Sequence, residues 1–105
     1  MEYVRAKKHL GQHFLTDLSV AKRLADIVHS FPNKQVLEIG PGMGVLTQYL
    51  HSDRTLKVIE IDHESVHYLA SNDLLPIANI IQGDFLKYDI YKIYTEPFIL
   101  CGNYP

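Results

Sequence analysis

The chain has 105 residues, a hydrophobic content of 47% and a formal net charge of −2, which fits one small domain with a packed core. The negative charge argues against a protein that binds nucleic acid over its whole surface, and no apolar run approaches the ~20 residues that span a bilayer. The single cysteine, Cys101, excludes an internal disulfide and predicts a cytoplasmic location, where thiols stay reduced.

The charge is unevenly distributed along the chain. Residues 1–34 carry a net charge of +3, whereas the rest carries −5. Residues 1–15 show no clear periodicity and form a basic leader, in which Arg5, Lys7 and Lys8 are candidate contacts for the phosphates of a nucleic acid. The alternative is a solvated arm without a partner.

After the leader, helix-like and strand-like patterns alternate. Thr16 is a candidate helix cap, and apolar residues at helical spacing predict a helix that ends at Pro32-Asn33. The next predicted elements are a strand at 35–39, a helix at 45–51, a strand at 56–61, a helix at 64–75 and a strand at 79–82. Residues 89–94 are ambiguous, with one or two helical turns. Residues 98–101 are all apolar and predict a strand that is buried on both faces.

This alternation predicts an α/β fold with a parallel sheet and helices on both of its faces. Ligands of such sheets bind at the carboxyl ends of the strands, near the point where the strand order reverses. The four motifs described next all fall at those ends.

The first strand leads into a loop in which Gly40, Gly42 and Gly44 alternate with other residues. Glycines let the backbone turn tightly and approach a ligand closely, and the following helix would aim its free amides at that ligand. The dinucleotide fingerprint G-x-G-x-x-G/A would need a small residue at position 45, which is Val45. Glu38, the acid before the loop, suits a cofactor with a cationic amino group and a sulfonium better than a pyrophosphate.

Acidic residues also follow the second and third strands. Glu60 lies at the separation from Gly40 at which a carboxylate meets ribose hydroxyls, and we expect it to be exposed without a ligand. Asp62 is better explained as the cap of the 64–75 helix. Asp84 can accept a hydrogen bond from an adenine amine, while Phe85 offers apolar surface to the ring. The plain alternative for Gly83-Asp84 is a turn.

The fourth strand is followed by Asn103, Tyr104 and Pro105. An exocyclic amine is a poor nucleophile because its lone pair is conjugated into the ring. An asparagine side-chain carbonyl and a backbone carbonyl can accept the two amine hydrogens and free the lone pair to attack a methyl group. Positioning then does most of the catalysis, and no strong base is needed.

With these motifs the sequence resembles the ribosomal RNA adenine dimethyltransferases, in particular the KsgA-like group that acts on small-subunit RNA. The segment from Lys8 to Leu15 matches the leader of that family, Gly-Gln-Asn/His-Phe-Leu, and the four strand-end motifs follow in the expected order. The resemblance implies a Rossmann-like fold, S-adenosylmethionine as cofactor and methyl transfer to the N6 amine of adjacent adenines. It also implies small-subunit ribosomal RNA, within a precursor of the 30S-type particle, as the partner.

The resemblance also implies roles for individual residues. The stretch with Gln12, His13 and Leu15 would lie by the methionine end of the cofactor, flanked by Gly40 and Gly42. The complete set implied for cofactor binding is Gln12, His13, Leu15, Glu38, Gly40, Gly42, Glu60, Ile61, Asp84, Phe85 and Asn103. The catalytic set implied is Asn103, Tyr104 and Pro105, with Asn103 and Pro105 orienting the target amine.

The sequence departs from the family pattern in two ways. Tyr104 stands where the family motif usually has Leu, and the aromatic residue that normally follows the motif has no counterpart here. We therefore expect residues 1–105 to be the amino-terminal part of the catalytic domain, truncated after the fourth strand and inactive as a fragment. The strand at 97–102 would then be an exposed edge through which the fragment self-associates.

Three alternative functions remain open from the sequence. The first is an antibiotic-resistance methyltransferase that acts on large-subunit RNA, in which Asn more often replaces His13. The second is a nicotinamide-dependent oxidoreductase, disfavoured by Val45, and the third is a non-enzymatic nucleic-acid-binding module. We expect no metal site, because neither a cysteine nor a third histidine completes the pairs His9/His13 and His63/His67.

Overall fold

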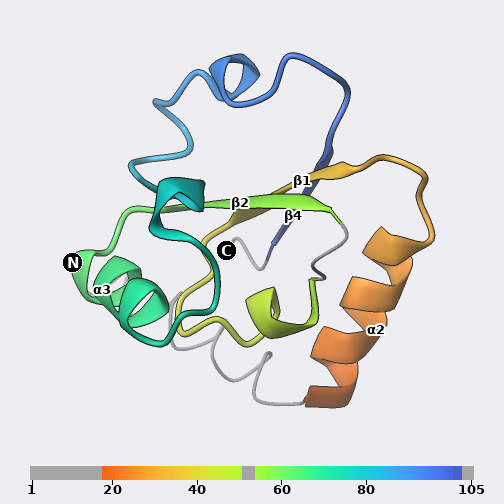
Figure 1. Cartoon of the computed structure of the whole chain (residues 1–105), viewed down its shortest axis with the longest axis horizontal. Coiled ribbons are helices and arrows are strands. Elements are labelled where there is room, and N and C mark those ends of the chain that lie inside the picture. Colours follow the sequence, from red (N-terminus) through yellow and green to blue (C-terminus); the bar gives the residue numbers. More distant parts are fainter. Residues whose placement is uncertain (1–17, 51–53, 103–105) are drawn as a thin grey trace.

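The computed structural model describes residues 18–50 and 54–102, which form a parallel sheet with the strand order β3-β2-β1-β4 (Figure 1). The strands are β1 (Gln35–Ile39), β2 (Thr55–Glu60), β3 (Ile80–Gln82) and β4 (Ile99–Gly102). Val36 of β1 pairs with Leu56 of β2 on one side and with Ile99 of β4 on the other. The parallel sheet and the central 35–39 strand are therefore as predicted, and the strand order reverses at β1.

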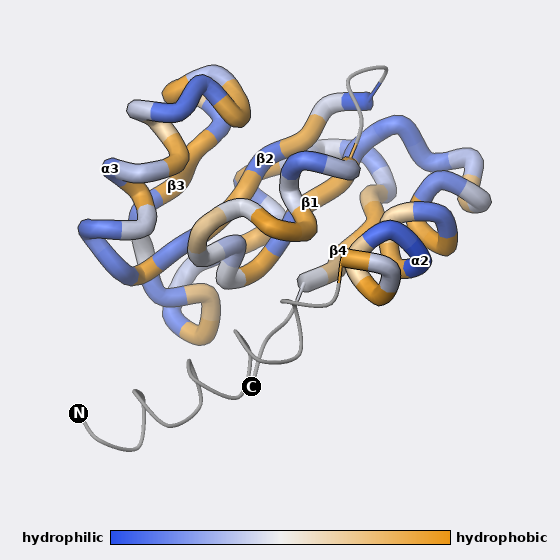
Figure 2. Tube along the Cα trace, turned by 90° about the horizontal axis from the view of Figure 1, so that it is seen from below, coloured by the Kyte–Doolittle hydropathy of each residue, from blue (hydrophilic) through white to orange (hydrophobic). Residues whose placement is uncertain are grey.

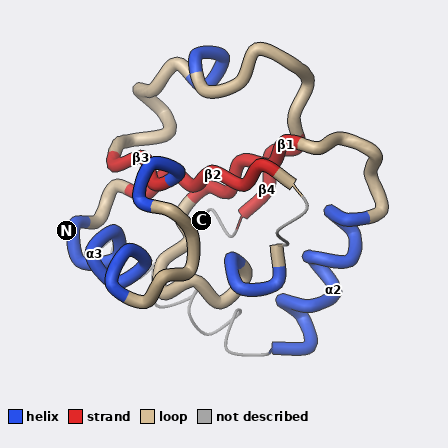
Figure 3. Tube along the Cα trace, viewed as in Figure 1, coloured by secondary structure: helices blue, strands red, loops and turns tan. Residues whose placement is uncertain are grey.

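The helices of the described part are α2 (Leu18–His29), α3 (His63–Ser71) and three short 3-10 helices, η1 (Thr47–Tyr49), η2 (Ile77–Asn79) and η3 (Ile90–Lys92) (Figure 3). The helix predicted at 45–51 is wrong as far as residue 50, because only η1 forms there. Val45 and Thr47 are β-branched and disfavour an α-helix. In addition, the amides of Tyr49 and Leu50 bond to carbonyls three residues back rather than four.

Helix α3 ends four residues before its predicted end at position 75, and Asn72 and Asp73 explain why. The side chain of Asn72 donates to the carbonyl of Tyr68 at 2.8 Å, and Asp73 has a left-handed backbone with φ 53°. A residue in this conformation after a helix is a common way to end it, and Asn and Asp tolerate the conformation best after glycine. The Asn72-Asp73 pair indicates the end of a helix, but the prediction followed the apolar periodicity, which continues to Leu75.

Each face of the sheet has its own hydrophobic core. On one face, α2, α3 and the segment around η1 pack on the strands through Ala25, Val28, Val36, Leu46, Leu50, Leu56, Val58, Leu69 and Leu75. On the other face, Leu37, Ile39 and Ile59 pack against Tyr94 of the segment that contains η3. Right-handed crossovers explain the division, because the chain moves across the sheet in one direction from β1 to β3 and returns in the other to β4. Figure 2 shows hydrophobic residues along the central strands.

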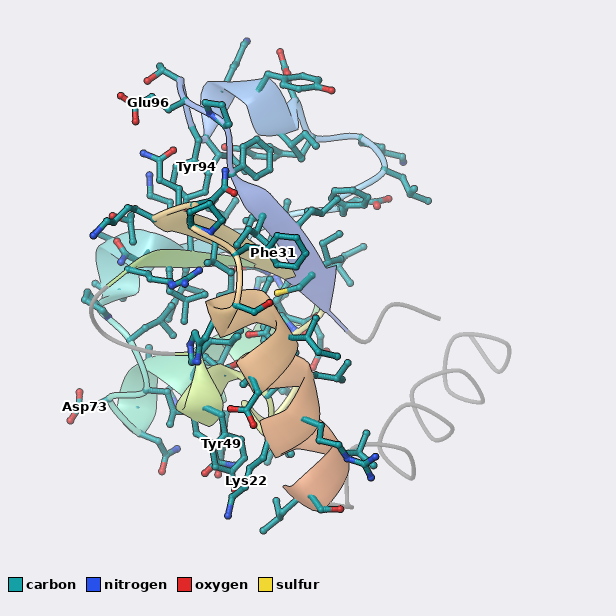
Figure 4. The ribbon with its side chains drawn as sticks, turned by 90° about the vertical axis from the view of Figure 1, so that its right-hand side faces the viewer. Lys22, Phe31, Tyr49, Asp73, Tyr94 and Glu96 are labelled. Carbon is teal, nitrogen blue, oxygen red and sulfur yellow. The ribbon has the colours of Figure 1, made fainter. Side chains whose placement is uncertain are left out.

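Tyr94 fixes the returning segment to the sheet. Its hydroxyl lies 2.8 Å from the carbonyl oxygens of both Val36 and Thr55, and its side chain is only 5% exposed. Lys57 caps the arrangement, with its ammonium 4.9 Å from the Tyr94 ring centre. Burial raises the pKa of Tyr94 to about 12, so this hydroxyl stays protonated as a donor. Figure 4 shows Tyr94 on one side of the sheet and Lys22 and Tyr49 on the other.

Strand β4 is an edge of the described sheet, and it is less buried than predicted. Leu100 is 45% exposed, and the other residues of the strand are at most half-buried. Beside it lies an apolar groove of about 250 Å³ between β4 and α2, lined in part by Ile27, Phe31 and Ile99. The expectation of burial on both faces was wrong, because Leu100 and Gly102, which share one face of the strand, are exposed.

Candidate functional site

The loop after β1 is held by a backbone bond within itself, by a backbone bond to β2 and by one carboxylate. The amide of Gly40 donates to the carbonyl of Ile59, and the amide of Gly44 donates to the carbonyl of Pro41, both at 2.9 Å. The amide of Gly42 donates to Oε1 of Glu60, also at 2.9 Å. All three glycine amides of the loop are therefore engaged within the protein. A loop that cradles a pyrophosphate needs such amides free for the ligand.

Glycine is required in this loop by its backbone conformation. Gly40, Gly42 and Gly44 have φ of 63°, 55° and 82°, a region that other residues rarely adopt. A Cβ on Gly40 or Gly42 would meet nothing within 4 Å, so the backbone of the loop is open to a close-packed ligand there. The prediction that this loop allows close approach is consistent with the geometry.

Glu60 joins the end of β2 to the glycine loop. Besides the bond from Gly42, its Oε2 accepts the amide of Asp62 at 3.0 Å. The residue is 5% exposed, so the expectation that it is exposed without a ligand was wrong. The sequence indicated that Glu60 belongs to the site, but not that the amides of Gly42 and Asp62 would bind its carboxylate. Each carboxylate oxygen can still accept a second hydrogen bond, which is what two adjacent ribose hydroxyls require.

Glu38 lies beneath the same loop and is 1% exposed. The hydroxyl of Thr47, in η1, donates to its Oε1 at 2.6 Å. Burial raises the pKa of Glu38 to about 7; the Thr47 bond opposes this rise and the charge of Glu60 adds to it. Sequence reasoning placed Glu38 at the site but missed Thr47, because nothing in the segment around Thr47 indicates a bond to an acid nine residues earlier.

The remaining described candidates lie at the ends of β2 and β3. Asp84 is half-buried, and its Oδ1 accepts the amide of Leu86 at 3.0 Å. Phe85 packs against the core cluster of Leu37, Ile39, Ile59 and Tyr94, whereas Ile61 is 58% exposed. Asp62 caps α3 as predicted, since its Oδ2 accepts the amide of Ser65 at 3.0 Å.

Several candidates lie outside the described residues. These are Arg5, Lys7, Lys8, Gln12, His13 and Leu15 in the leader, and Asn103, Tyr104 and Pro105 after β4. The helix cap predicted at Thr16 lies there too. Among residues 18–50 and 54–102, no group of three His, Cys, Asp or Glu side chains could hold a metal ion. The same residues contain no helix that is both long and apolar enough to cross a membrane.

A parallel sheet with a glycine loop after its central strand and acids at the ends of the next two strands is typical of a Rossmann-like domain. The model of the family described as "Ribosomal RNA adenine dimethylase" matches residues 3–105. The chain belongs to this family.

Curated relatives agree with the family. The chain is 52% identical over 107 residues to "Ribosomal RNA small subunit methyltransferase A" of Bacteroides thetaiotaomicron, with 100% of this chain and 40% of the relative covered. The protein of the same description from Flavobacterium johnsoniae is 53% identical, with 100% and 41% covered. The chain thus spans about 40% of the length of these relatives.

A solved structure shares the fold. "Crystal structure of 23S rRNA methyltransferase ErmE" superimposes with a TM-score of 0.60 and 32% sequence identity, over 80% of this chain and 34% of that chain. The predicted Rossmann-like methyltransferase fold is confirmed.

Proposed function

We propose that this chain binds S-adenosylmethionine and belongs to an enzyme that dimethylates the N6 amines of adenines in small-subunit ribosomal RNA. Family membership implies this methyl donor, and the curated relatives carry the small-subunit description. We further propose that residues 1–105 supply the cofactor-binding part of the catalytic domain, and that the enzyme works in the cytoplasm on a precursor of the small ribosomal subunit.

The engaged glycine amides are the observation that carries this proposal. Because Gly40, Gly42 and Gly44 use their amides internally, a pyrophosphate would find none of these donors available. The buried acid Glu38 before the loop would also suit a pyrophosphate poorly. The same surroundings favour a ligand that carries a sulfonium and an amino group and offers ribose hydroxyls as donors. This disfavours the nicotinamide alternative, and a plain nucleic-acid-binding module would leave both buried acids unexplained.

In the proposed site, the bound cofactor supplies an activated methyl group, and the residues of the chain position its surroundings. Glu60 accepts the ribose hydroxyls, Asp84 accepts from the adenine amine, and Ile61 and Phe85 provide apolar surface. The side chain of Asn103 and the backbone of the 103–105 motif accept hydrogens from the target amine. We propose that Gln12, His13 and Leu15 of the leader contact the methionine end.

Two measurements test the function. Calorimetry should detect binding of S-adenosylmethionine to the chain and no comparable binding of NAD. The natural protein that carries this chain should transfer labelled methyl groups to precursor small subunits, with dimethyladenosine found by mass spectrometry of the RNA. Methylation of large-subunit RNA instead would support the resistance-type alternative, and binding of NAD alone would refute the proposal.

Glu60→Ala is expected to weaken cofactor binding by roughly 1.5 to 3 kcal/mol, the usual size for hydrogen bonds to a charged group. Because Glu60 also accepts the amides of Gly42 and Asp62, the same change should lower the free energy of unfolding. Calorimetry and urea denaturation measure the two effects. The exposed Glu64 of α3 provides the control, since Glu64→Ala should change neither quantity appreciably. Unchanged affinity in Glu60→Ala would mean that the ribose binds elsewhere.

We propose that Arg5, Lys7 and Lys8 contact RNA phosphates. Each lost contact should flatten the slope of log affinity against log salt concentration by about 0.7 to 0.9. The triple alanine variant of the natural protein should therefore bind RNA with a clearly smaller salt slope in filter-binding titrations. A slope identical to that of the wild type would favour a solvated arm without a phosphate contact.

A further inference from the structure

The end of helix α3 lies against the last glycine of the loop after β1. A Cβ on Gly44 would overlap Cδ1 of Leu74 and would lie 3.1 Å from Cδ2 of Leu69. The side chains of these two leucines therefore occupy the space that a side chain at position 44 would need. Gly40 and Gly42 differ in this respect, because a Cβ on either of them would meet nothing within 4 Å. Of the three glycines, Gly44 is the one that faces packed protein.

The way in which α3 ends explains why both leucines meet at this point. Asp73, labelled in Figure 4, has φ 53°, and its amide donates to the carbonyl of Ala70 at 3.3 Å. The amide of Leu74 donates to the carbonyl of Leu69, also at 3.3 Å. Two such bonds around a left-handed residue form a Schellman motif, which often brings the residue after it into apolar contact with the last turn of the helix. The motif thus brings Leu74 to Leu69, and Gly44 lies beside both.

The unit of β2 and α3 therefore holds the glycine loop at two points. At the end of β2, Oε1 of Glu60 accepts the amide of Gly42 at 2.9 Å. At the end of α3, Leu69 and Leu74 lie against Gly44. Leu69 is 0% exposed, whereas Leu74 is only partly buried and packs on the margin of the core. Leu74 can thus be truncated with less loss of core packing than Leu69.

Resting on the proposed function, we propose that Leu74 is a positioning residue for cofactor binding. It acts through Gly44. By filling the space beside this glycine it keeps the loop against β2, so that the Gly42 amide stays on Glu60 and the carboxylate keeps one orientation toward the ribose hydroxyls. Truncation of Leu74 leaves a cavity into which the loop can move. The contact differs from the one that the third glycine makes in dinucleotide folds, where it serves close packing of its own helix on the strand.

Hydrogen exchange and calorimetry of the chain test this role. In Leu74→Ala, the Gly42 amide should exchange about fivefold faster relative to the amides that join β1 to β2, because the loop leaves Glu60 more often. The affinity for S-adenosylmethionine should fall about threefold to tenfold, within the range expected of a residue that acts through its neighbours. The exchange measurement needs no ligand, so it reports on the loop whether or not the cofactor binds.

Leu75→Ala is the matched control. Leu75 is 8% exposed in the same core, but the atoms nearest to a Cβ on Gly44 belong to Leu74 and Leu69. The control should lose at least as much unfolding free energy as Leu74→Ala, because it is the more buried leucine. Its exchange ratio for Gly42 and its cofactor affinity should remain those of the wild type. Leu75→Val takes its place if Leu75→Ala does not fold.

A second pair of variants tests the contact at Gly44 itself. Gly44→Ala should weaken cofactor binding, and adding Leu74→Ala should recover part of the loss by making room for the new methyl group. The two changes should be non-additive by about fivefold in affinity, as residues in contact commonly are. Gly40→Ala is the control, because Leu74→Ala makes no room there and the two effects should add. If Gly44→Ala does not fold, the comparison of Leu74→Ala with Leu75→Ala decides alone.

Three results would be decisive against these ideas. Equal exchange ratios and affinities in Leu74→Ala and Leu75→Ala would show that Leu74 merely supports the core, which overturns the proposal. Additive effects of Gly44→Ala and Leu74→Ala would overturn it as well. If the wild type does not bind S-adenosylmethionine, while Leu74→Ala still speeds exchange of the Gly42 amide, the proposed function is refuted and only the role of Leu74 in holding the loop stands.

Discussion

Arg54→Met is expected to lower the free energy of unfolding by about 3 kcal/mol, as measured by urea denaturation. The guanidinium of Arg54 donates to four backbone carbonyls at 2.8–3.1 Å, those of Val28, His29, Phe31 and Asn33. The first two belong to the last turn of α2, where carbonyls lack helical partners and the helix dipole favours a cation. Hydrogen bonds to charged groups contribute roughly 1.5–3 kcal/mol each but are not additive.

Two matched variants show whether the guanidinium is responsible. Arg23, on the exposed face of α2, is the control, because Arg23→Met removes the same group from a solvated position. Arg54→Lys keeps the charge but lacks the planar guanidinium that reaches four carbonyls. Its loss of unfolding free energy should therefore be intermediate. Equal stability of Arg54→Met and Arg23→Met would mean that water replaces the four bonds without cost.

Gly102→Ala is expected to destabilise the chain by about 3 kcal/mol or more and to displace the end of β4. Gly102 has φ 147°, a conformation reserved for glycine. A Cβ there would overlap the carbonyl oxygen of Ile39 and lie 2.9 Å from its nitrogen. The obstacle is backbone of the central strand, which cannot rotate away as a side chain could. Because the 103–105 motif follows directly, the same change should also impair methyl transfer by the natural protein.

Gly102→Ala lowers the stability for two reasons, the positive φ and the overlap of the Cβ with Ile39, and Gly40→Ala separates them. Gly40 also has a positive φ, but a Cβ there would meet nothing within 4 Å. Its substitution should therefore show only the conformational cost, roughly 1–2 kcal/mol. If Gly102→Ala and Gly40→Ala lower the free energy of unfolding equally, the overlap with Ile39 is relieved by movement of β4.

The sequence predicted those features that depend on neighbouring residues in the chain. The strand-like patterns of the sequence predicted the ends of β1 and β2 to within one residue, and Asp62 caps α3 as expected. The glycine loop and the strand-end acids were recognisable because their spacing is local. The composition of 45–51 was less decisive, since the apolar residues there suited an α-helix while the β-branched ones favoured the short 3-10 turn.

The missed features arise from contacts between distant segments. Nothing near Arg54 in the chain indicates that four carbonyls around the end of α2 would converge on it. The burial of Glu60 depends on the loop after another strand, and the bond of Thr47 to Glu38 crosses the glycine loop. Such partners follow from the assembled sheet, which is why the acids could be found from the sequence while their surroundings could not.

The position of β4 beside β1 also sets the order in which this domain can fold. Val36 meets Leu56 only 20 residues later in the chain, but its other neighbour, Ile99, comes 63 residues later. Closing the longer loop costs more chain entropy and slows folding. During synthesis, β1, β2 and β3 can pair before β4 has left the ribosome, so one edge of β1 stays unpaired until β4 is available. Pulsed hydrogen exchange during refolding should accordingly protect the β2 amides bonded to β1 before those that join β1 to β4.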